Sequence, residues 1–218
     1  LRRGRIKWVD AATVWSDVSI ATVLLWFAES SRSQLASNAS DQSETGWRGS
    51  RIEAARAKKK LETREAEIES GEVIVFAQDE CHLLAGDATG YVWGRRNEKT
   101  EIPIENSRER QTYYGGLNLY NQQFFMKPYP RGNGDHTVDF MKDLQTAYPN
   151  KKLIILWNNA RYHRGKKLKK YLNELNKGMT DEKDYKITCY HFAPNAPDQN
   201  PVEDVWLRGK SFLRRNFY

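Results

Sequence analysis

The stretch that decides the fold is EVIVFAQDECH, Glu72 to His82. Five mostly apolar, β-favouring residues from Val73 to Ala77 run into the adjacent acids Asp79 and Glu80. A short apolar run of this kind is typical of a strand that is buried on both faces of a sheet. Because charged groups are costly inside such a strand, we expect the two acids at its C-terminal end, where the sheet opens to solvent.

Two more polar clusters flank regular elements later in the chain. The apolar run LIILW (Leu153 to Trp157) ends in the pair Asn158 and Asn159. The segment PNAPDQNPVEDVW (Pro194 to Trp206) carries Glu203 at the expected start of a helix. Three polar clusters at the ends of regular elements can meet at one edge of a sheet, and we predict an active site at that edge.

Composition points to a polyanionic partner. The 218 residues are enough for one buried core and a smaller appendage. The formal net charge is +7, and seven Trp and eleven Tyr accompany it, a balance that favours nucleic acid. The two cysteines, Cys81 and Cys189, are far apart and lack metal-ligand spacing. We therefore expect reduced, buried thiols in a cytosolic protein.

The first 70 residues differ from the rest. Residues 1–35 form a predicted helical segment, with a capped helix over Asp17–Ala28. This helix is either part of a helix-turn-helix DNA-binding region or an amphipathic helix that packs on the main domain. Residues 36–70 are interpreted as a polar linker and a charged helix over Arg51–Ser70, which we expect to be solvated.

Residues 71–218 form the predicted main domain. After the first strand, Thr112–Tyr120 and Gln123–Tyr129 are expected to form a hairpin. A helix over His136–Tyr148, a strand over Leu153–Trp157, a helix over Arg164–Asn176, a strand over Ile187–Phe192 and a helix over Pro201–Arg215 follow. The order is three antiparallel strands, then helix, strand, helix, strand, helix. It predicts a ribonuclease H-like α/β fold, a mixed sheet with helices on both faces.

In this topology the first and fourth strands are neighbours in the middle of the sheet. Asp79 and Asn158 would then lie within a few ångströms of each other, and Glu203 can point at the same spot. Clustered carboxylates bind hard divalent cations such as Mg²⁺. Two such ions about 4 Å apart activate a water or a 3′-hydroxyl and stabilise the leaving oxygen of a phosphodiester. The alternative is that these side chains are ordinary loop residues.

Several motifs together resemble the catalytic domain of mariner-like and related bacterial insertion-sequence DDE transposases. They are VIVFAQDECHL, GYVWGRR, GGLNLYNQQ, LIILWNNARYHRGKKLKKYL and HFAPNAPDQNPVEDVWLRGK, in that order from Gly71 to about Phe212. The resemblance implies that Asp79, the position of Asn158 and Glu203 hold two Mg²⁺ ions, or Mn²⁺, for DNA strand cleavage and strand transfer. It also implies a prokaryotic, cytoplasmic protein that associates with the nucleoid when bound to DNA.

The sequence departs from this family at one position that matters. The family has Asp-Asn-Ala after the fourth strand, whereas this chain has Asn158-Asn159-Ala160. Asparagine keeps the shape and one acceptor oxygen of aspartate but loses its negative charge. We therefore expect catalysis to be impaired, either because the chain is an engineered, cleavage-dead variant or because it is a decayed natural copy. The interval from Asn158 to Glu203 is also long, with the extra residues expected in the polar segment Asn176–Tyr185.

Other residues are candidates for supporting roles. Glu80 is either a supporting acid or a solvated neighbour, His163 contacts phosphate or a metal-bound water or else packs, and Asn200 is expected to cap the helix that carries Glu203. The candidates for contacts with DNA phosphates are basic: Arg95, Arg96, Arg161, Arg164, Lys166 and Lys167. Trp93 and Trp206 either line the site or belong to the core.

The sequence is therefore interpreted as a transposase catalytic domain behind part of a DNA-binding region. The expected partners are double-stranded DNA of the transposon ends and of the target, with a homodimer on the DNA. No signal peptide is evident, and the longest apolar run, Ile20–Ala28, is too short to span a bilayer, so no membrane partner is expected. The alternatives are a transposase derivative that binds DNA without cutting it and a ribonuclease H-like nuclease without strand transfer.

Overall fold

A computed structural model describes residues 56–84, 110–192 and 200–216 of the chain. The predictions for the helix over Asp17–Ala28, for the linker, and for Trp93, Arg95 and Arg96 lie outside these ranges. The elements are α3 (Glu65–Glu69), β1 (Val73–Leu84), β2 (Arg110–Asn118), β3 (Phe124–Tyr129), α4 (Gly134–Ala147), β4 (Lys152–Trp157), the 3₁₀ turn η3 (Arg161–Arg164), α5 (Lys166–Leu175), the 3₁₀ turn η4 (Glu182–Asp184), β5 (Ile187–His191) and α6 (Val202–Asn216). Within these ranges, no helix is long and apolar enough to cross a membrane.

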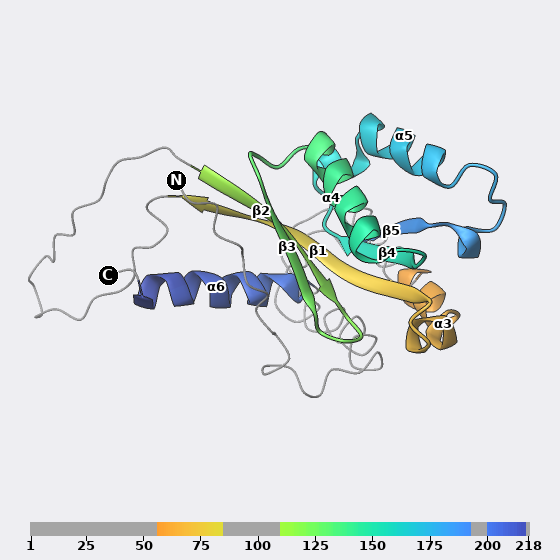
Figure 1. Cartoon of the computed structure of the whole chain (residues 1–218), viewed down its shortest axis with the longest axis horizontal. Coiled ribbons are helices and arrows are strands. Elements are labelled where there is room, and N and C mark those ends of the chain that lie inside the picture. Colours follow the sequence, from red (N-terminus) through yellow and green to blue (C-terminus); the bar gives the residue numbers. More distant parts are fainter. Residues whose placement is uncertain (1–55, 85–109, 193–199, 217–218) are drawn as a thin grey trace, which may run out of the picture.

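The five strands form one mixed sheet in the order β3-β2-β1-β4-β5 (Figure 1). β1 pairs with β2 in antiparallel and with β4 in parallel orientation, and β5 is parallel to β4. The sequence-based prediction of this order of strands and helices, and of adjacent first and fourth strands, is confirmed.

Alternation along β1 divides the core into two layers, because successive side chains of a strand point to opposite faces. Val73, Val75 and Ala77 pack in one buried cluster with side chains of the N-terminal helical region and of α6. Ile74 and Phe76 pack in a second cluster with α4 and the start of α5. α4 and α5 accordingly cover one face of the sheet and α6 lies on the other (Figure 1).

The end of the first strand differs from the prediction. β1 continues past Asp79 to Leu84, because its antiparallel pairing with β2 runs on to the pair Leu84 and Arg110. Its parallel pairing with β4 stops earlier, at Ala77 and Leu156. The sheet therefore opens on one side of β1 only, and Asp79 lies inside a strand at the point where its neighbour β4 ends.

The helical region before β1 also differs from the prediction. Residues 56–62 are helical and are followed by α3, but this region is not merely a solvated helix. Ala57, Leu61, Arg64 and Ile68 are all at most 5 % exposed. Their spacing of four, three and four places them on one helical face, and Leu61 and Ile68 pack against the β1 side chains. The many charges concealed this apolar stripe.

The polar segment Asn176–Tyr185 lies at the opposite end of the sheet from Asp79, before β5. It contains η4, where Glu182 pairs with Lys60, and the Lys183 carbonyl accepts a hydrogen bond from Arg64 at 3.1 Å. The segment therefore anchors the N-terminal helical region and leaves the surroundings of Asp79 undisturbed, as expected from the sequence.

Gly115 of β2 allows α6 to approach the sheet. It is paired with Asp79 across the ladder, and a Cβ atom built on it would lie 2.5 Å from Cζ2 of Trp206 and closer still to Cζ of Phe124. The Phe124 and Trp206 rings meet edge to face, with centroids 5.1 Å apart. Space for the Trp206 indole over the sheet therefore depends on a residue without a side chain.

Gly115→Ala should lower the free energy of unfolding by about 1–3 kcal/mol, because the added methyl group forces two rings out of a packed position. Urea unfolding followed by tryptophan fluorescence measures this. Gly209→Ala in α6 is the matched control, because no atom lies within 4 Å of its added Cβ, and it should stabilise the helix slightly. Equal stability of the Gly115→Ala variant and the unaltered chain would contradict this packing.

Candidate active site

Asp79 and Asn158 meet where β4 ends. The last parallel pair joins Ala77 and Leu156, so Asp79 and Asn158 follow two residues later on the same face of the sheet. The Asn158 side chain donates a hydrogen bond from Nδ2 to Oδ1 of Asp79, at 3.2 Å. The predicted convergence of these two positions is therefore present in the structure.

The orientation of the Asn158 amide is fixed by its second hydrogen bond. Its Oδ1 accepts the backbone N–H of Ala160 at 3.0 Å. A flipped amide would turn an NH₂ group toward this N–H, leaving two donors opposed, and an unsatisfied buried donor costs about 1–3 kcal/mol. Asn158 thus presents a hydrogen-bond donor to Asp79, where an aspartate would present an acceptor.

Glu203 lies in the first turn of α6, the helix that follows Asn200. The buried Asn200 side chain accepts the backbone N–H of Val202 at 3.3 Å, and its carbonyl accepts that of Glu203 at 3.1 Å. Asn200 therefore caps α6, as expected from the sequence. Glu203 lies close enough to Asp79 for its charge to act on it, and Trp206 of the next turn packs over the Asp79–Gly115 pair.

Burial raises the pKa of Asp79 from its ordinary value of 3.8 to about 8, with the negative charges of Glu80 and Glu203 adding to the rise. The buried indole N–H of Trp206 lies near enough to lower this pKa by a smaller amount, although none of the described residues accepts a hydrogen bond from it. The raised pKa of Asp79 is thus mainly a consequence of its burial beside two other acids.

The adjacent acid has a different environment, because Glu80 points to the opposite face of β1. Its side chain is 3 % exposed and accepts hydrogen bonds from Nε2 of His163 at 3.1 Å, from Tyr162 at 3.0 Å and from Gln78 at 3.0 Å. Burial favours a higher pKa, but the hydrogen bonds and the charge of His163 outweigh it and hold the pKa of Glu80 below its usual value. Glu80 is thus an ionised, fully paired buried acid.

His163 connects this acid to Asn158. The ring stacks on Trp157 with centroids 4.3 Å apart, and its Nδ1 donates to the backbone carbonyl of Asn158 at 3.1 Å. His191 at the end of β5 donates to the same carbonyl at 3.2 Å. Sequence reasoning named Glu80 and His163 but missed Tyr162 and His191. The alternation of faces along β1 could have indicated a partner such as Tyr162 for Glu80, and the position of β5 beside β4 could have indicated the contact of His191 with Asn158.

The residues present fit a divalent ion poorly. Asn158 directs its amide NH₂ toward Asp79, and an NH₂ group cannot ligate a cation. Within the described parts of the chain, no group of three or more His, Cys, Asp or Glu side chains is placed to hold a metal ion. The binding of two ions by Asp79, Asn158 and Glu203 stays a prediction.

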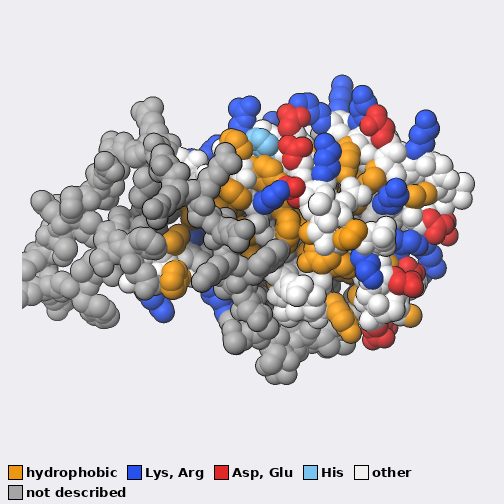
Figure 2. Space-filling model, viewed as in Figure 1, with side chains coloured by type: hydrophobic (Ala, Val, Ile, Leu, Met, Phe, Trp, Pro, Cys, Tyr) orange, Lys and Arg blue, Asp and Glu red, His pale blue; other side chains and the backbone are white. Residues whose placement is uncertain are grey.

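The basic residues lie on one helix and the turn before it. Arg161, Arg164, Lys166 and Lys167 are all exposed, although Lys167 pairs with Asp135 of α4 at 2.6 Å and Arg164 donates to Asn159. Lys and Arg side chains recur along the rim of the molecule over α4 and α5 (Figure 2). The phosphate contacts predicted for them stay a prediction.

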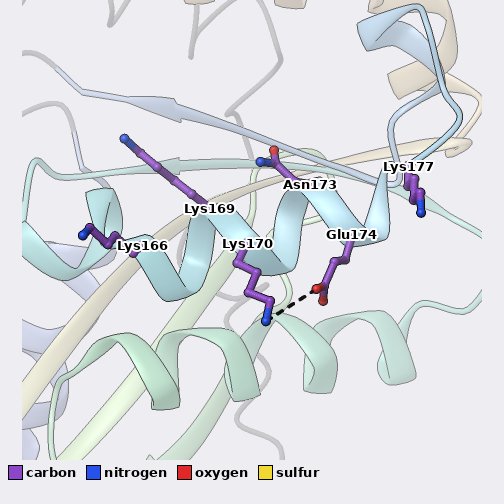
Figure 3. Close-up of a pocket in the computed structure, with 6 residues that line it drawn as sticks. All are labelled: Lys166, Lys169, Lys170, Asn173, Glu174 and Lys177. Atoms are coloured by element: carbon purple, nitrogen blue, oxygen red, sulfur yellow. Dashed lines mark ion pairs between the residues drawn. The ribbon is translucent and has the colours of Figure 1, made fainter.

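α5 also carries basic residues that sequence reasoning missed. A hollow of about 490 Å³ runs along its outer side, lined by Lys166, Lys169, Lys170, Asn173, Glu174 and Lys177 (Figure 3). Lys170 pairs there with Glu174 at 3.9 Å, and the other lysines of the hollow form no ion pair with the residues that the structure describes. This hollow is a surface feature that is separate from the Asp79–Asn158 pair.

Comparison with known families decides the classification. Residues 74–218 match the family model described as DDE superfamily endonuclease. The chain belongs to this family. The match includes Asp79, Asn158 and Glu203, and it confirms the resemblance seen in the sequence motifs. No curated protein matches this chain.

The fold is shared with a solved structure of a Mos1 transposase. The Mos1 transposase paired-end complex with left transposon end matches with 13 % identity and a TM-score of 0.53, over 80 % of this chain and 51 % of that one. The catalytic domain of Mos1 mariner transposase matches with 12 % identity, a TM-score of 0.45 and coverages of 81 % and 75 %. A chain of the simian T-cell lymphotropic virus intasome matches with 6 % identity and a TM-score of 0.43, over 62 % of this chain and 37 % of that one. The DDE endonuclease spans about half the length of the transposase in the paired-end complex.

The raised pKa of Asp79 predicts the pH dependence of stability. Between the ordinary value of 3.8 and about 8, the folded state binds more protons than the unfolded state, so stability should fall as the pH rises through this window. Thermal unfolding of the Asp79→Asn variant between pH 5 and 8 should show a flatter decline than that of the unaltered chain. Asp204→Asn, an exposed acid of the same helical turn as Glu203, is the control. Identical slopes for Asp79→Asn and the unaltered chain would contradict a buried, protonated Asp79.

Proposed function

We propose that this DDE endonuclease is the catalytic-domain part of a DNA transposase, which binds DNA of transposon ends and cuts it poorly or not at all. The family match supports the transposase-type chemistry, and the fold shared with a Mos1 transposase paired-end complex supports it at the level of architecture. The observation that carries the impairment is the hydrogen bond from Asn158 Nδ2 to Asp79 Oδ1.

This hydrogen bond stands where an aspartate at position 158 would bring two carboxylates face to face. With an aspartate at position 158, Asp79, residue 158 and Glu203 would hold divalent ions, which would supply activation of the attacking oxygen and stabilisation of the leaving oxygen of a phosphodiester. Mos1 structures with Mg and with Mn exist, and we extend the use of such ions, two per site, to a chain with aspartate at position 158. With Asn158, the side-chain amide donates a hydrogen bond to Asp79 in the absence of an ion, and the repulsion between two carboxylates is avoided.

DNA binding does not need the missing carboxylate. In the proposed complex, exposed lysines of α5 contact phosphates, and Arg161 and Arg164 do so nearer to Asn158. α5 begins two residues after η3, so its basic side extends directly from the edge of the sheet where Asp79 lies. Double-stranded DNA of the transposon ends and of the target is the expected partner, and the protein acts as a homodimer that holds two ends together.

The second candidate is a transposase derivative that holds DNA without cutting it. The same hydrogen bond favours it, because the amide of Asn158 makes two good hydrogen bonds that an unpaired carboxylate could not replace. The two candidates differ in whether the scaffold retains the capacity for chemistry, and restoring the acid separates them.

Asn158→Asp should switch on nicking of labelled terminal-repeat DNA in Mg²⁺. A barrier lowered by about 3 kcal/mol corresponds to a rate increase of roughly a hundredfold. Mn²⁺ should support slight activity of the unaltered chain, because it is less strict about ligand type. Mg²⁺ should also raise the unfolding midpoint of the Asn158→Asp variant, since it relieves the repulsion between two carboxylates.

The control for this assay is the double variant Asn158→Asp, Glu203→Ala, which should lose the nicking activity again. If the unaltered chain already cuts as fast as the Asn158→Asp variant, position 158 is not the second metal-ligand position. A variant that binds Mg²⁺ but never cuts would support the non-cutting derivative.

Charge reversal on α5 should weaken DNA binding in a salt-dependent manner. For the double variant Lys166→Glu, Lys169→Glu, the slope of log affinity against log salt should become less steep by up to about two, because each phosphate contact contributes about 0.9 to it. Fluorescence anisotropy with duplex DNA over a series of salt concentrations measures the slope. Lys142→Glu, Lys151→Glu, on and after α4, is the matched control. An unchanged slope would show that α5 does not touch phosphates.

A further inference from the structure

The two acids of β1 serve different faces of the sheet, and only one of them belongs to the site with Asn158. Asp79 shares its face with Asn158 and α6, whereas Glu80 lies on the face covered by α4 and η3. Glu80 cannot reach the Asp79–Asn158 pair, because its two oxygens are already hydrogen-bonded to Gln78, Tyr162 and His163.

Two hydrogen bonds hold the His163 ring between Asn158 and Glu80. Its Nδ1 faces the carbonyl oxygen of Asn158, which can only accept, so this nitrogen carries a proton. Its Nε2 faces Oε1 of Glu80, a carboxylate that also receives two other donors. The side chains of His163 and Glu80 thus form a buried pair, 0 % and 3 % exposed. Buried ion pairs of this kind contribute geometry more than net stability.

From this geometry we propose that Glu80 and His163 are positioning residues: the ion pair fixes the backbone carbonyl of residue 158 from the far side of the sheet, and so sets the direction of that residue's side chain toward Asp79. The Trp157 ring stacks on the His163 imidazole, with an angle of 6° between the two ring planes, and so fixes the orientation of the imidazole. The chain turns away from the sheet after Trp157, where β4 ends, so no strand ladder constrains residue 158. His163 and His191 replace that constraint with two N–H donors on one carbonyl.

This inference rests on the proposed role of position 158, but its first test needs no cutting. The side-chain amide of Asn158 gives a pair of NMR signals, which are assigned by their loss in Asn158→Asp. Asp79→Ala provides the reference position of these signals when the hydrogen bond is absent. His163→Phe keeps a ring on Trp157 but removes both N–H donors, and it should move the Asn158 signals toward the reference position.

His163→Asn separates positioning from packing. The amide nitrogen of asparagine occupies the place of imidazole Nδ1, so this variant can still donate to the carbonyl of residue 158 and should return the Asn158 signals toward their original position. Tyr129→Phe, which removes a hydrogen bond to Asp143 on the distant β3–α4 contact, is the control and should leave them unchanged. Unmoved Asn158 signals in His163→Phe would overturn the proposal.

The second test uses the Asn158→Asp variant as background. Adding His163→Phe or Glu80→Gln should lower kcat for nicking roughly 10- to 100-fold, the usual effect of removing a group that orients a metal ligand. KM for DNA should stay the same, because both side chains are buried. A loss of activity that only follows the fall in the unfolding midpoint would overturn the proposal. If Asn158→Asp alone never cuts, the proposed function fails, and the NMR signals still decide the role of His163.

Discussion

The parallel pairing of β1 with β4 is the constraint on which the site depends. It brings two positions that are 79 residues apart to hydrogen-bonding distance, because the last ladder pair lies two residues before each of them. The side-chain period of two then assigns Asp79 and its neighbour Glu80 to opposite faces. One dipeptide thereby supplies an acid to the site and another to its support, and a slip of one residue in register would exchange them.

Electrostatics at this edge follow from a single change of group. Asp79 is buried, with Glu80 beside it in sequence and the charge of Glu203 acting on it, and all three effects raise its pKa. An amide donor at position 158 and a proton on Asp79 together neutralise the cluster. Burial thus favours the protonated form of Asp79, whereas the acid on the other face stays ionised because hydrogen bonds from His163, Gln78 and Tyr162 lower its pKa. The two faces of one strand resolve the same problem in opposite ways.

Much of the fold could be predicted from the sequence, since apolar runs and helical periods are local signals. The end of β1 could not, because it depends on how far a distant strand, β2, continues to pair with it. Nor could the burial of Ala57 and Ile68, whose apolar stripe is dispersed among charges. Asp79 and Asn158 were recognisable as ends of apolar runs. His191 was not, because its contact with the Asn158 carbonyl arises only from the parallel neighbour β5.

Gly115 shows how a position without any functional group can govern function. The Trp206 indole lies in the space that a side chain at position 115 would fill, and Trp206 belongs to the same helix as Glu203. The location of Glu203 is therefore set partly from β2, a strand that contributes no reactive atom. In a mutational scan scored by DNA cleavage in an active background, position 115 would rank among the intolerant sites. Positions that tolerate no substitution in such a scan would then include residues that give the site its shape as well as residues that take part in the chemistry.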